Sequence, residues 1–266
     1  MKADDHAETD AQRSRYRIEA LAKGLDVLRL FDESVTSLKL REISDLTGIP
    51  LPTAFRVVAT LEEGGFVERL PDGAIQPGVA VLTLGSAALR GSSIVQLSEP
   101  PLRQLTEDTG ETVNLGVLRG DRVLYLVRLR NSDLVTANIQ VGSTLPAAYT
   151  SMGKLLLAYL SEEELAATLA DHDFTRYAGP NAVASFDELH AQLEKIRVDG
   201  YALQDQELAA GLRSVSVPVF GRDERPAAAI NIAVASTRHD VVALRGPLLE
   251  SARSTAADIS RRLRAN

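Results

Sequence analysis

Apolar residues in the first quarter of the chain recur at helical spacing and predict three consecutive helices. They return every three or four positions over residues 18–32, 41–47 and 52–63, which is the period of a helix with one buried face. Gly48 is suited to end the second helix, because a left-handed C-cap position favours glycine. Pro52 is suited to the first turn of the third helix, where a missing N–H removes no hydrogen bond.

A β-hairpin is predicted directly after the third helix. Residues 66–70 and 74–76 are short strand-like stretches, and Asp72-Gly73 between them is a strong turn signal. Three helices and a hairpin, with a short turn between the second and third helices, form the order of a winged helix-turn-helix. We therefore assign residues 16–78 to such a domain and residues 1–15, which are polar and patternless, to a disordered leader.

The rest of the chain alternates strands and helices and predicts a second domain, which makes the fold class α+β. The helical stretch 79–94 is interpreted as a linker helix within residues 79–97, and Pro100-Pro101 marks the boundary beyond it. Residues 98–266 form the second domain. Its expected helices are 101–109, 151–159, 162–170, 185–198 and 240–264, and its expected strands are 111–118, 122–130, 134–141, 201–206, 212–220 and 227–235.

Two of these strands combine a strongly apolar face with a face of small, partly polar residues. In residues 212–220 valines alternate with serines, and in residues 227–235 isoleucines and a valine alternate with alanines and Asn231. A small, partly polar face leaves space and hydrogen-bonding groups for a ligand. The same residues equally suit close packing of a helix on the sheet, and both interpretations stay open.

Charge and composition restrict the partners and the compartment. The formal net charge is −7, and residues 11–80 contain nine Lys or Arg against ten Asp or Glu, so DNA binding depends on where the cations lie. The chain has no cysteine and four scattered histidines, which predicts no metal site and no thiol chemistry; we expect no cofactor. We find no signal peptide and no apolar stretch of bilayer length, and therefore expect a cytoplasmic protein without a membrane partner.

The third predicted helix has a polar side that is suited to contact DNA. Thr53, Arg56 and Thr60 lie opposite its apolar stripe, and an arginine near the start of a recognition helix can donate two hydrogen bonds to a guanine. Arg69 in the hairpin and Arg17 before the first helix are candidate contacts to the DNA backbone. The alternative is a plain helical bundle in which Arg56 is a solvated surface charge.

The second domain contains candidate groups for binding an anion. Residues 149–153 begin a predicted helix, whose unpaired N–H groups are suited to hold a carboxylate. Arg130 and Arg213 are candidate cations for the same ligand, whereas Asp205 and Glu207 would repel it.

Two other functions fit parts of the sequence. Ser151-Met-Gly-Lys154 matches the S-x-x-K motif of serine acyl-enzymes, but no Ser-Asp-Asn or Lys-Thr-Gly partner follows. A hydrolase that uses Ser151 and Lys154 is therefore one alternative. A ligand sensor whose N-terminal module binds a protein is the other.

Eight segments spread over nearly the whole chain form a highly specific set. They are ALAKGLDVLRLF at 20–31, LREISDLTGIP at 40–50, TAFRVVATL at 53–61, GFVE at 65–68, YTSMGKLLLA at 149–158, DQELAAGLRS at 205–214, SVPVF at 216–220 and AAINIAV at 228–234. In this order they resemble the IclR family of bacterial regulators, over about residues 18–263. The resemblance implies a winged helix-turn-helix, a linker helix and a GAF-like effector-binding domain. It also implies a regulator and not an enzyme, a double-stranded DNA operator, and a homodimer or a dimer of dimers.

The resemblance further implies which residues hold the effector. They are Gln204, Ser214, Asn231 and Ala233, with the backbone near Thr150, Ser151 and Met152. The four side chains differ from those of a relative that holds a small oxo-acid. The stretch from residue 139 to 154 looks most like the regulators of aromatic-acid catabolism, which respond to protocatechuate, 4-hydroxybenzoate or β-ketoadipate. We therefore expect an aromatic or dicarboxylic acid that controls operator affinity allosterically through the linker helix.

One departure from the family concerns the start of the recognition helix. The family usually has a basic or polar residue followed by serine there, and this chain has Leu51-Pro52. The change removes a capping hydroxyl and one expected phosphate contact. Operator sequence and affinity therefore cannot be transferred from relatives.

Overall fold

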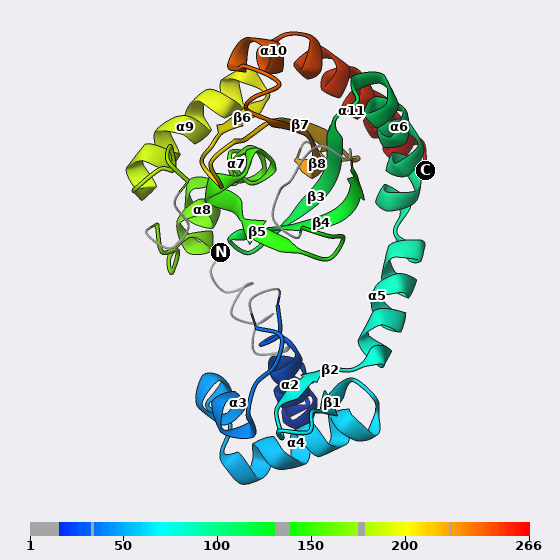
Figure 1. The fold of residues 1–266 in the computed structure, drawn as a ribbon, viewed down its shortest axis with the longest axis vertical. Helices are drawn as coiled ribbons and strands as arrows, with labels where there is room; N and C mark the ends of the chain where they lie inside the picture. The colour runs from blue at the N-terminus through cyan, green and yellow to red at the C-terminus, as the bar shows by residue number, and fades with distance from the viewer. Residues whose placement is uncertain (1–15, 33–34, 131–138, 175–178, 224) are drawn as a thin grey trace, which may run out of the picture. The chain divides into compact units, whose positions relative to one another are not determined.

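The structure, a computed structural model, divides the chain into two compact units, Met1–Ala88 and Leu89–Asn266 (Figure 1). It describes residues 16–32, 35–130, 139–174, 179–223 and 225–266. The division between the units falls within α5 (Val79–Gly91), the helix that the sequence predicts as a linker.

The N-terminal unit has the predicted order of three helices and a hairpin. Its elements are α2 (Glu19–Leu28), α3 (Leu40–Thr47), α4 (Leu51–Glu63), β1 (Val67–Arg69) and β2 (Ile75–Pro77). Gly48 ends α3 with φ of 69°, and α4 has a proline in its first turn and no side-chain cap, both as expected. One small core joins all of these elements and consists of Val27, Leu38, Ile43, Ile49, Ala54, Val58, Val67 and Ile75.

The second unit is built on one antiparallel sheet of six strands. The strands are β3 (Thr112–Arg119), β4 (Arg122–Leu129), β5 (Thr144–Pro146), β6 (Ala202–Asp205), β7 (Leu212–Phe220) and β8 (Pro226–Ala235). Their order in space is β5-β4-β3-β8-β7-β6. The chain therefore places β8, near its end, beside β3 in the middle of the sheet.

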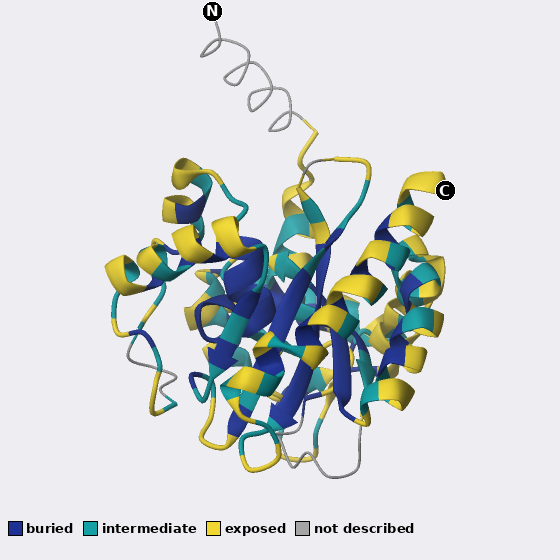
Figure 2. Cartoon of the chain, turned by 90° about the horizontal axis from the view of Figure 1, so that it is seen from above, coloured by how far each residue is buried: buried dark blue, intermediate teal, exposed yellow. Residues whose placement is uncertain are grey.

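Each face of this sheet has its own core. On one face the valines and isoleucines of β3, β7 and β8 pack against α6 (Ser93–Thr109) and α11 (Pro247–Ala265). On the other face lie η1 (Ala147–Tyr149), α7 (Ser151–Leu157), α8 (Glu162–Thr168) and α9 (Phe186–Asp199). Figure 2 shows the buried strands between helices whose outer sides are exposed. This two-sided cover explains why the central strands are buried on both faces.

The small-residue face predicted for β7 and β8 is the face that receives α7. Close approach is visible at Gly116 of β3, where a Cβ would lie 2.6 Å from the side chain of Val123 and 3.3 Å from Cε of Met152 in α7. Helix packing is therefore one use of the small residues, and the cavity described below is the other.

Two predicted boundaries are wrong. α6 runs through Pro100-Pro101, although each proline removes one helix hydrogen bond. Its buried Leu102 and Leu105 pack against the sheet face described above, and this packing outweighs the local preference. The last helix is interrupted at Gly246, whose ψ of −112° is not helical, and Pro247 starts α11 after the short α10 (Val241–Arg245).

The strand predicted at 134–141 is not observed where it can be assessed. Residues 131–138 lie outside the described residues, and residues 139–141 form no strand. The sheet edge beside β4 is occupied instead by β5, which the sequence did not predict. In the part of the chain that the structure describes, no single helix combines the length and apolar character needed to cross a bilayer, although α5 and α6 together reach both as a bent pair.

Candidate functional site

A narrow cavity lies on the small-residue face of the sheet, beside the start of α7. Its volume is about 20 Å³, which is room for roughly one water molecule. The lining residues are Asn114, Tyr125, Arg128, Ile139, Tyr149, Thr150, Gln204, Leu208, Leu212, Ser214, Asn231 and Ala233. Five of them, Thr150, Gln204, Ser214, Asn231 and Ala233, are residues that the family resemblance assigns to the effector, so the structure brings these five together around one space.

A continuous chain of hydrogen bonds crosses the sheet side of the cavity. Arg128 donates through Nη1 to Oδ1 of Asn114 at 3.0 Å, and Asn114 donates through Nδ2 to Oδ1 of Asn231 at 2.7 Å. Nδ2 of Asn231 lies 3.5 Å from Oγ of Ser151, which lies 2.7 Å from Oγ of Ser214. The first three residues are direct cross-strand partners on β4, β3 and β8, which brings their side chains together.

The arginine of the cavity is Arg128, and the expectation for Arg130 is corrected. Arg130 follows the last residue of β4, is exposed, and is not among the lining residues. Arg128, by contrast, lies within β4 and is the cross-strand partner of Asn114 in β3, so its side chain is held against the sheet. Its burial lowers the pKa of its guanidinium, but an arginine stays protonated in a folded protein.

The sequence analysis missed Asn114 as well as Arg128. A signal was available, because Asn114 is an amide within the otherwise largely apolar stretch of β3, where a side chain with 1% exposure must find partners.

The start of α7 contributes two hydroxyl groups to this region. Oγ1 of Thr150 accepts a hydrogen bond from N of Gly153 at 3.0 Å and so caps the helix. One of the N–H groups expected to hold a carboxylate is therefore already satisfied. Ser151 belongs to the hydrogen-bonded chain, whereas Met152 is fully buried in the core beneath α7 and does not line the cavity.

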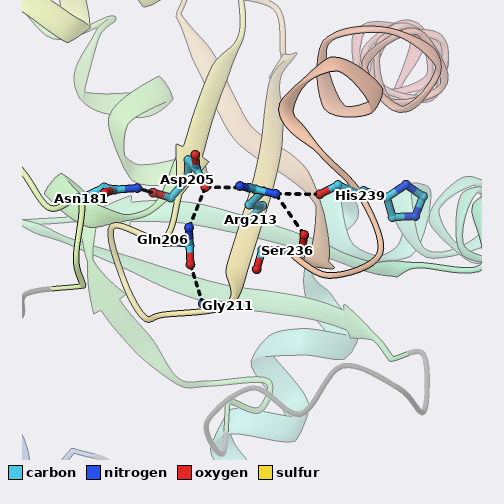
Figure 3. A network of polar contacts seen from close by, with 7 residues as sticks. All are labelled: Asn181, Asp205, Gln206, Gly211, Arg213, Ser236 and His239. Carbon is cyan, nitrogen blue, oxygen red and sulfur yellow. Dashed lines mark hydrogen bonds and ion pairs between the residues drawn. The ribbon is translucent and has the colours of Figure 1, made fainter.

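Arg213 stabilises a turn and is not a lining residue. Its Nε donates to Oδ1 of Asp205 at 2.6 Å, and its Nη1 donates to the carbonyls of Ser236 and His239, both at 3.0 Å (Figure 3). The predicted repulsion by Asp205 is thus offset by a partner cation.

Glu207 is neutralised in the same way by Lys154. The Glu207 carboxylate lies 2.5 Å from Nζ of Lys154, and both side chains are almost fully buried. Burial lowers the pKa of Lys154 and raises that of Glu207, while their mutual attraction opposes both shifts. Nζ also donates to Gln192 at 3.0 Å. The described hydrogen bonds of Ser151 and Lys154 therefore go to different partners and do not form the pair that an acyl-enzyme requires.

Gln204 lines the cavity and also organises the loop that follows β6. With its amide oxygen turned toward the loop, it accepts hydrogen bonds from N of Leu208 and Glu207 and donates to the carbonyl of Leu212. Its acceptor is therefore occupied by the protein itself.

Tyr149 adds an unused hydroxyl to the cavity wall. The side chain is fully buried, and its hydroxyl has no hydrogen-bond partner among the described residues. Burial, followed by the charge of Asp173, raises the pKa of this phenol. A buried hydroxyl without a partner is costly, and a ligand in the cavity would supply one.

In the N-terminal unit the predicted recognition helix exposes most of its polar side. Arg56 and Thr60 are exposed and Thr53 is half-buried. Oγ1 of Thr60 donates to the carbonyl of Arg56 at 2.9 Å. The helix is therefore not turned into its own core, which the DNA-binding interpretation requires.

The cations of this unit differ in their partners. Arg17 pairs with Glu19 at 3.3 Å and Arg69 pairs with Glu62 at 3.4 Å, so the two candidate backbone contacts start in exposed or half-buried ion pairs. Arg56 forms no ion pair with any residue that the structure describes in this unit.

A wide apolar groove lies in the same unit between α2, α4 and the start of α5. Leu21 and Leu25 of α2 are 59% and 45% exposed, and Leu84 of α5 is 58% exposed. All three line the groove, and Thr53, Arg56 and Thr60 form part of its α4 wall. The inward side of α2 is instead formed by Gly24 and Val27. The apolar residues of α2 thus contribute both to the core of this unit and to the groove on its surface.

Comparison with known proteins gives a consistent result. The family model for the C-terminal domain of the bacterial transcriptional regulator IclR matches residues 86–261, and the model for the IclR helix-turn-helix domain matches residues 20–71. The chain is 32% identical to the HTH-type transcriptional regulator XynR of Escherichia coli (strain K12) over 224 residues, which is 84% of this chain and 88% of XynR.

Two further relatives are a regulon regulator and a homolog whose structure contains a bound ligand. The Pca regulon regulatory protein of Pseudomonas putida is 32% identical over 215 residues, covering 80% of this chain and 73% of that protein. A crystal structure of an IclR homolog from Microbacterium hydrocarbonoxydans, complexed with 4-hydroxybenzoate, aligns with a TM-score of 0.73 at 27% identity, covering 93% of this chain and all of that one. On the matched domains and the fold, this chain belongs to the IclR family of bacterial transcriptional regulators.

Proposed function

We propose that this regulator changes its operator affinity when an aromatic or dicarboxylic acid binds in the cavity beside Arg128. The observation that supports this most directly is the lining itself, in which an arginine and several buried hydroxyl and amide groups surround a small space. Such convergent polar groups in an otherwise closed site are typical of ligand recognition. The 4-hydroxybenzoate complex of the Microbacterium homolog supports the acid class.

DNA is the proposed partner of the N-terminal unit, and α4 is the proposed recognition helix. Arg56 is exposed and has no described ion pair, so its guanidinium is available to a base edge. Thr53 and Thr60 are proposed contacts beside it, with Arg69 and Arg17 reaching the backbone after leaving their weak surface ion pairs. A regulator of this kind acts in the bacterial cytoplasm, where its operator lies.

The DNA contact is tested with DNA from the region upstream of the protein's own gene and a scrambled duplex of equal length. Arg56→Ala is expected to reduce the preference for the upstream DNA by about 1–3 kcal/mol, the usual value of a bidentate base contact. Arg41→Ala removes the same charge from an exposed position on α3, and it is expected to weaken binding to both duplexes equally. Fluorescence anisotropy gives both affinities. Equal weakening by Arg56→Ala would mean that Arg56 contacts phosphate only.

We further propose that a second copy of the chain covers the part of the groove formed by α2 and α5, which leaves the α4 wall with Arg56 accessible to DNA. The exposed leucines of this part and Val81 form an apolar surface of the kind that marks a protein interface. A homodimer presents two recognition helices, and a ligand that changes their spacing changes operator affinity. By linkage, the operator must then change the affinity for the acid by the same factor.

A further inference from the structure

The hydrogen-bonded chain on the sheet side of the cavity has a fixed direction. An arginine side chain can only donate hydrogen bonds, so Oδ1 of Asn114 must face Arg128 and Nδ2 of Asn114 must face Asn231. Asn231 therefore accepts at Oδ1 and presents Nδ2 to Ser151. Ser151 and Ser214 share one further hydrogen bond of 2.7 Å, in which either hydroxyl can be the donor. Whichever of them donates, the proton of the other hydroxyl points to no member of the chain.

With this direction, hydrogen bonds within the protein occupy the main acceptor atoms of the cavity, while several donor groups stay available to a ligand. The carbonyl oxygens of Asn114 and Asn231 accept within the chain, that of Gln204 accepts from the loop, and the oxygen of Thr150 accepts from Gly153. One hydroxyl proton of the Ser151–Ser214 pair and that of Thr150 remain, together with the unpartnered hydroxyl of Tyr149.

The charges around the cavity also favour a ligand that accepts hydrogen bonds. The carboxylate at the end of β6 and the one in the loop after it are each paired with a cation, Asp205 with Arg213 and Glu207 with Lys154. Arg128 contributes a positive charge to the lining itself. A ligand that brings a negative charge and hydrogen-bond acceptors is therefore matched by the wall, and a ligand that brings N–H donors is not.

We propose that Asn114 is a specificity-determining residue, which holds Arg128 against the sheet and sets the direction of the chain so that the cavity selects a carboxylate over its neutral amide. The proposal rests on the proposed function in taking the ligand to be an acid, and adds which residue makes the choice. Asn114 has 1% exposure and acts mainly through its neighbours, so it is a positioning residue for the ligand contacts.

The test measures binding of matched pairs of probes to the full-length protein by calorimetry. The probes are benzoate with benzamide, 4-hydroxybenzoate with 4-hydroxybenzamide, and β-ketoadipate with its diamide. The wild-type protein is expected to bind at least one acid with at least about tenfold preference over its amide, the usual effect of charge-assisted hydrogen bonds. Asn114→Leu is expected to remove that preference. Leu208→Ala, a lining residue outside the chain, is expected to change both affinities of a pair by the same factor.

If Asn114→Leu does not fold, Asn114→Asp is the second variant, because aspartate keeps the shape of the asparagine side chain. It can accept from Arg128 but cannot donate to Asn231, and it neutralises the arginine, so it is also expected to lose the preference for the acid. Retained preference in either folded variant overturns the role of Asn114 while leaving the acid effector intact. Failure of the wild-type protein to bind any of the acids overturns the acid effector as well, and DNA binding, measured separately, is unaffected by either result.

Discussion

Glu164 at the start of α8 is a half-buried carboxylate that its neighbours hold in the ionised form. Its Oε1 accepts from Nη1 of Arg225 at 2.7 Å and its Oε2 accepts from N of Ser161 at 2.8 Å. These bonds, that with Arg225 first, lower the pKa of Glu164 to about 2. A folded pKa below the unfolded one means that the stabilisation is present above pH 4.5 and is lost as the pH falls from 4.5 toward about 2.

Arg225→Ala is expected to raise the pKa of Glu164 toward its usual value, because the largest cause of the shift is removed. A carbon-13 NMR titration of the side-chain carboxyl measures this directly. Arg222→Ala, which removes a cation from the same loop but no described bond to Glu164, should leave the titration unchanged. An unshifted pKa in Arg225→Ala would show that the capping bonds to Ser161 suffice alone.

At the scale of elements, the packing of α7 on η1 depends on Gly153, which lies directly against the backbone of Ala147. A Cβ on Gly153 would lie 2.2 Å from the carbonyl oxygen of Ala147, which is far inside contact distance, so η1 and α7 would have to separate. Gly153→Ala is therefore expected to destabilise the protein by about 1–3 kcal/mol or more, as overpacking does, and to weaken acid binding.

Gly85→Ala is the matched control for this change. Gly85 also lies within a helix, but a Cβ there meets nothing within 4 Å, so the substitution should be neutral or stabilise by about 0.5–1 kcal/mol. Denaturant unfolding of both variants gives the comparison. A Gly153→Ala variant as stable as the control would mean that η1 moves without cost.

The elements that the sequence predicted well are those in which local pattern and tertiary packing agree. The helices of the N-terminal unit and β7 and β8 have clean periods, and all form within a few residues of the predicted bounds. The boundary predicted at Pro100-Pro101 is wrong because the packing of α6 overrides the local preference of proline. Arg128 was missed because only the strand register shows which arginine reaches the cavity. The cavity residues proposed for the effector came from the family resemblance, since no spacing along the chain reveals which strands become neighbours.

At the scale of the whole molecule, the apolar groove predicts how the assembly is disrupted. Leu84→Asp places a charge in the groove and is expected to weaken the proposed dimer by about 100-fold, since each copy loses a leucine that dimerisation would bury. Leu82, which is 74% exposed on the same helix but does not line the groove, supplies the control variant Leu82→Asp. Sedimentation equilibrium measures both. Equal dimerisation of the two variants would place the interface elsewhere.

The small size of the cavity has a consequence for the rate at which the protein senses its ligand. A space of about 20 Å³ cannot admit a benzoate ring, so side chains such as Leu208 and Leu212 must first move aside. The observed rate of association should therefore rise with acid concentration and then level off at the opening rate, whatever the affinity. With the proposed acid as its ligand, the protein would respond to an acid that persists and would filter out brief pulses.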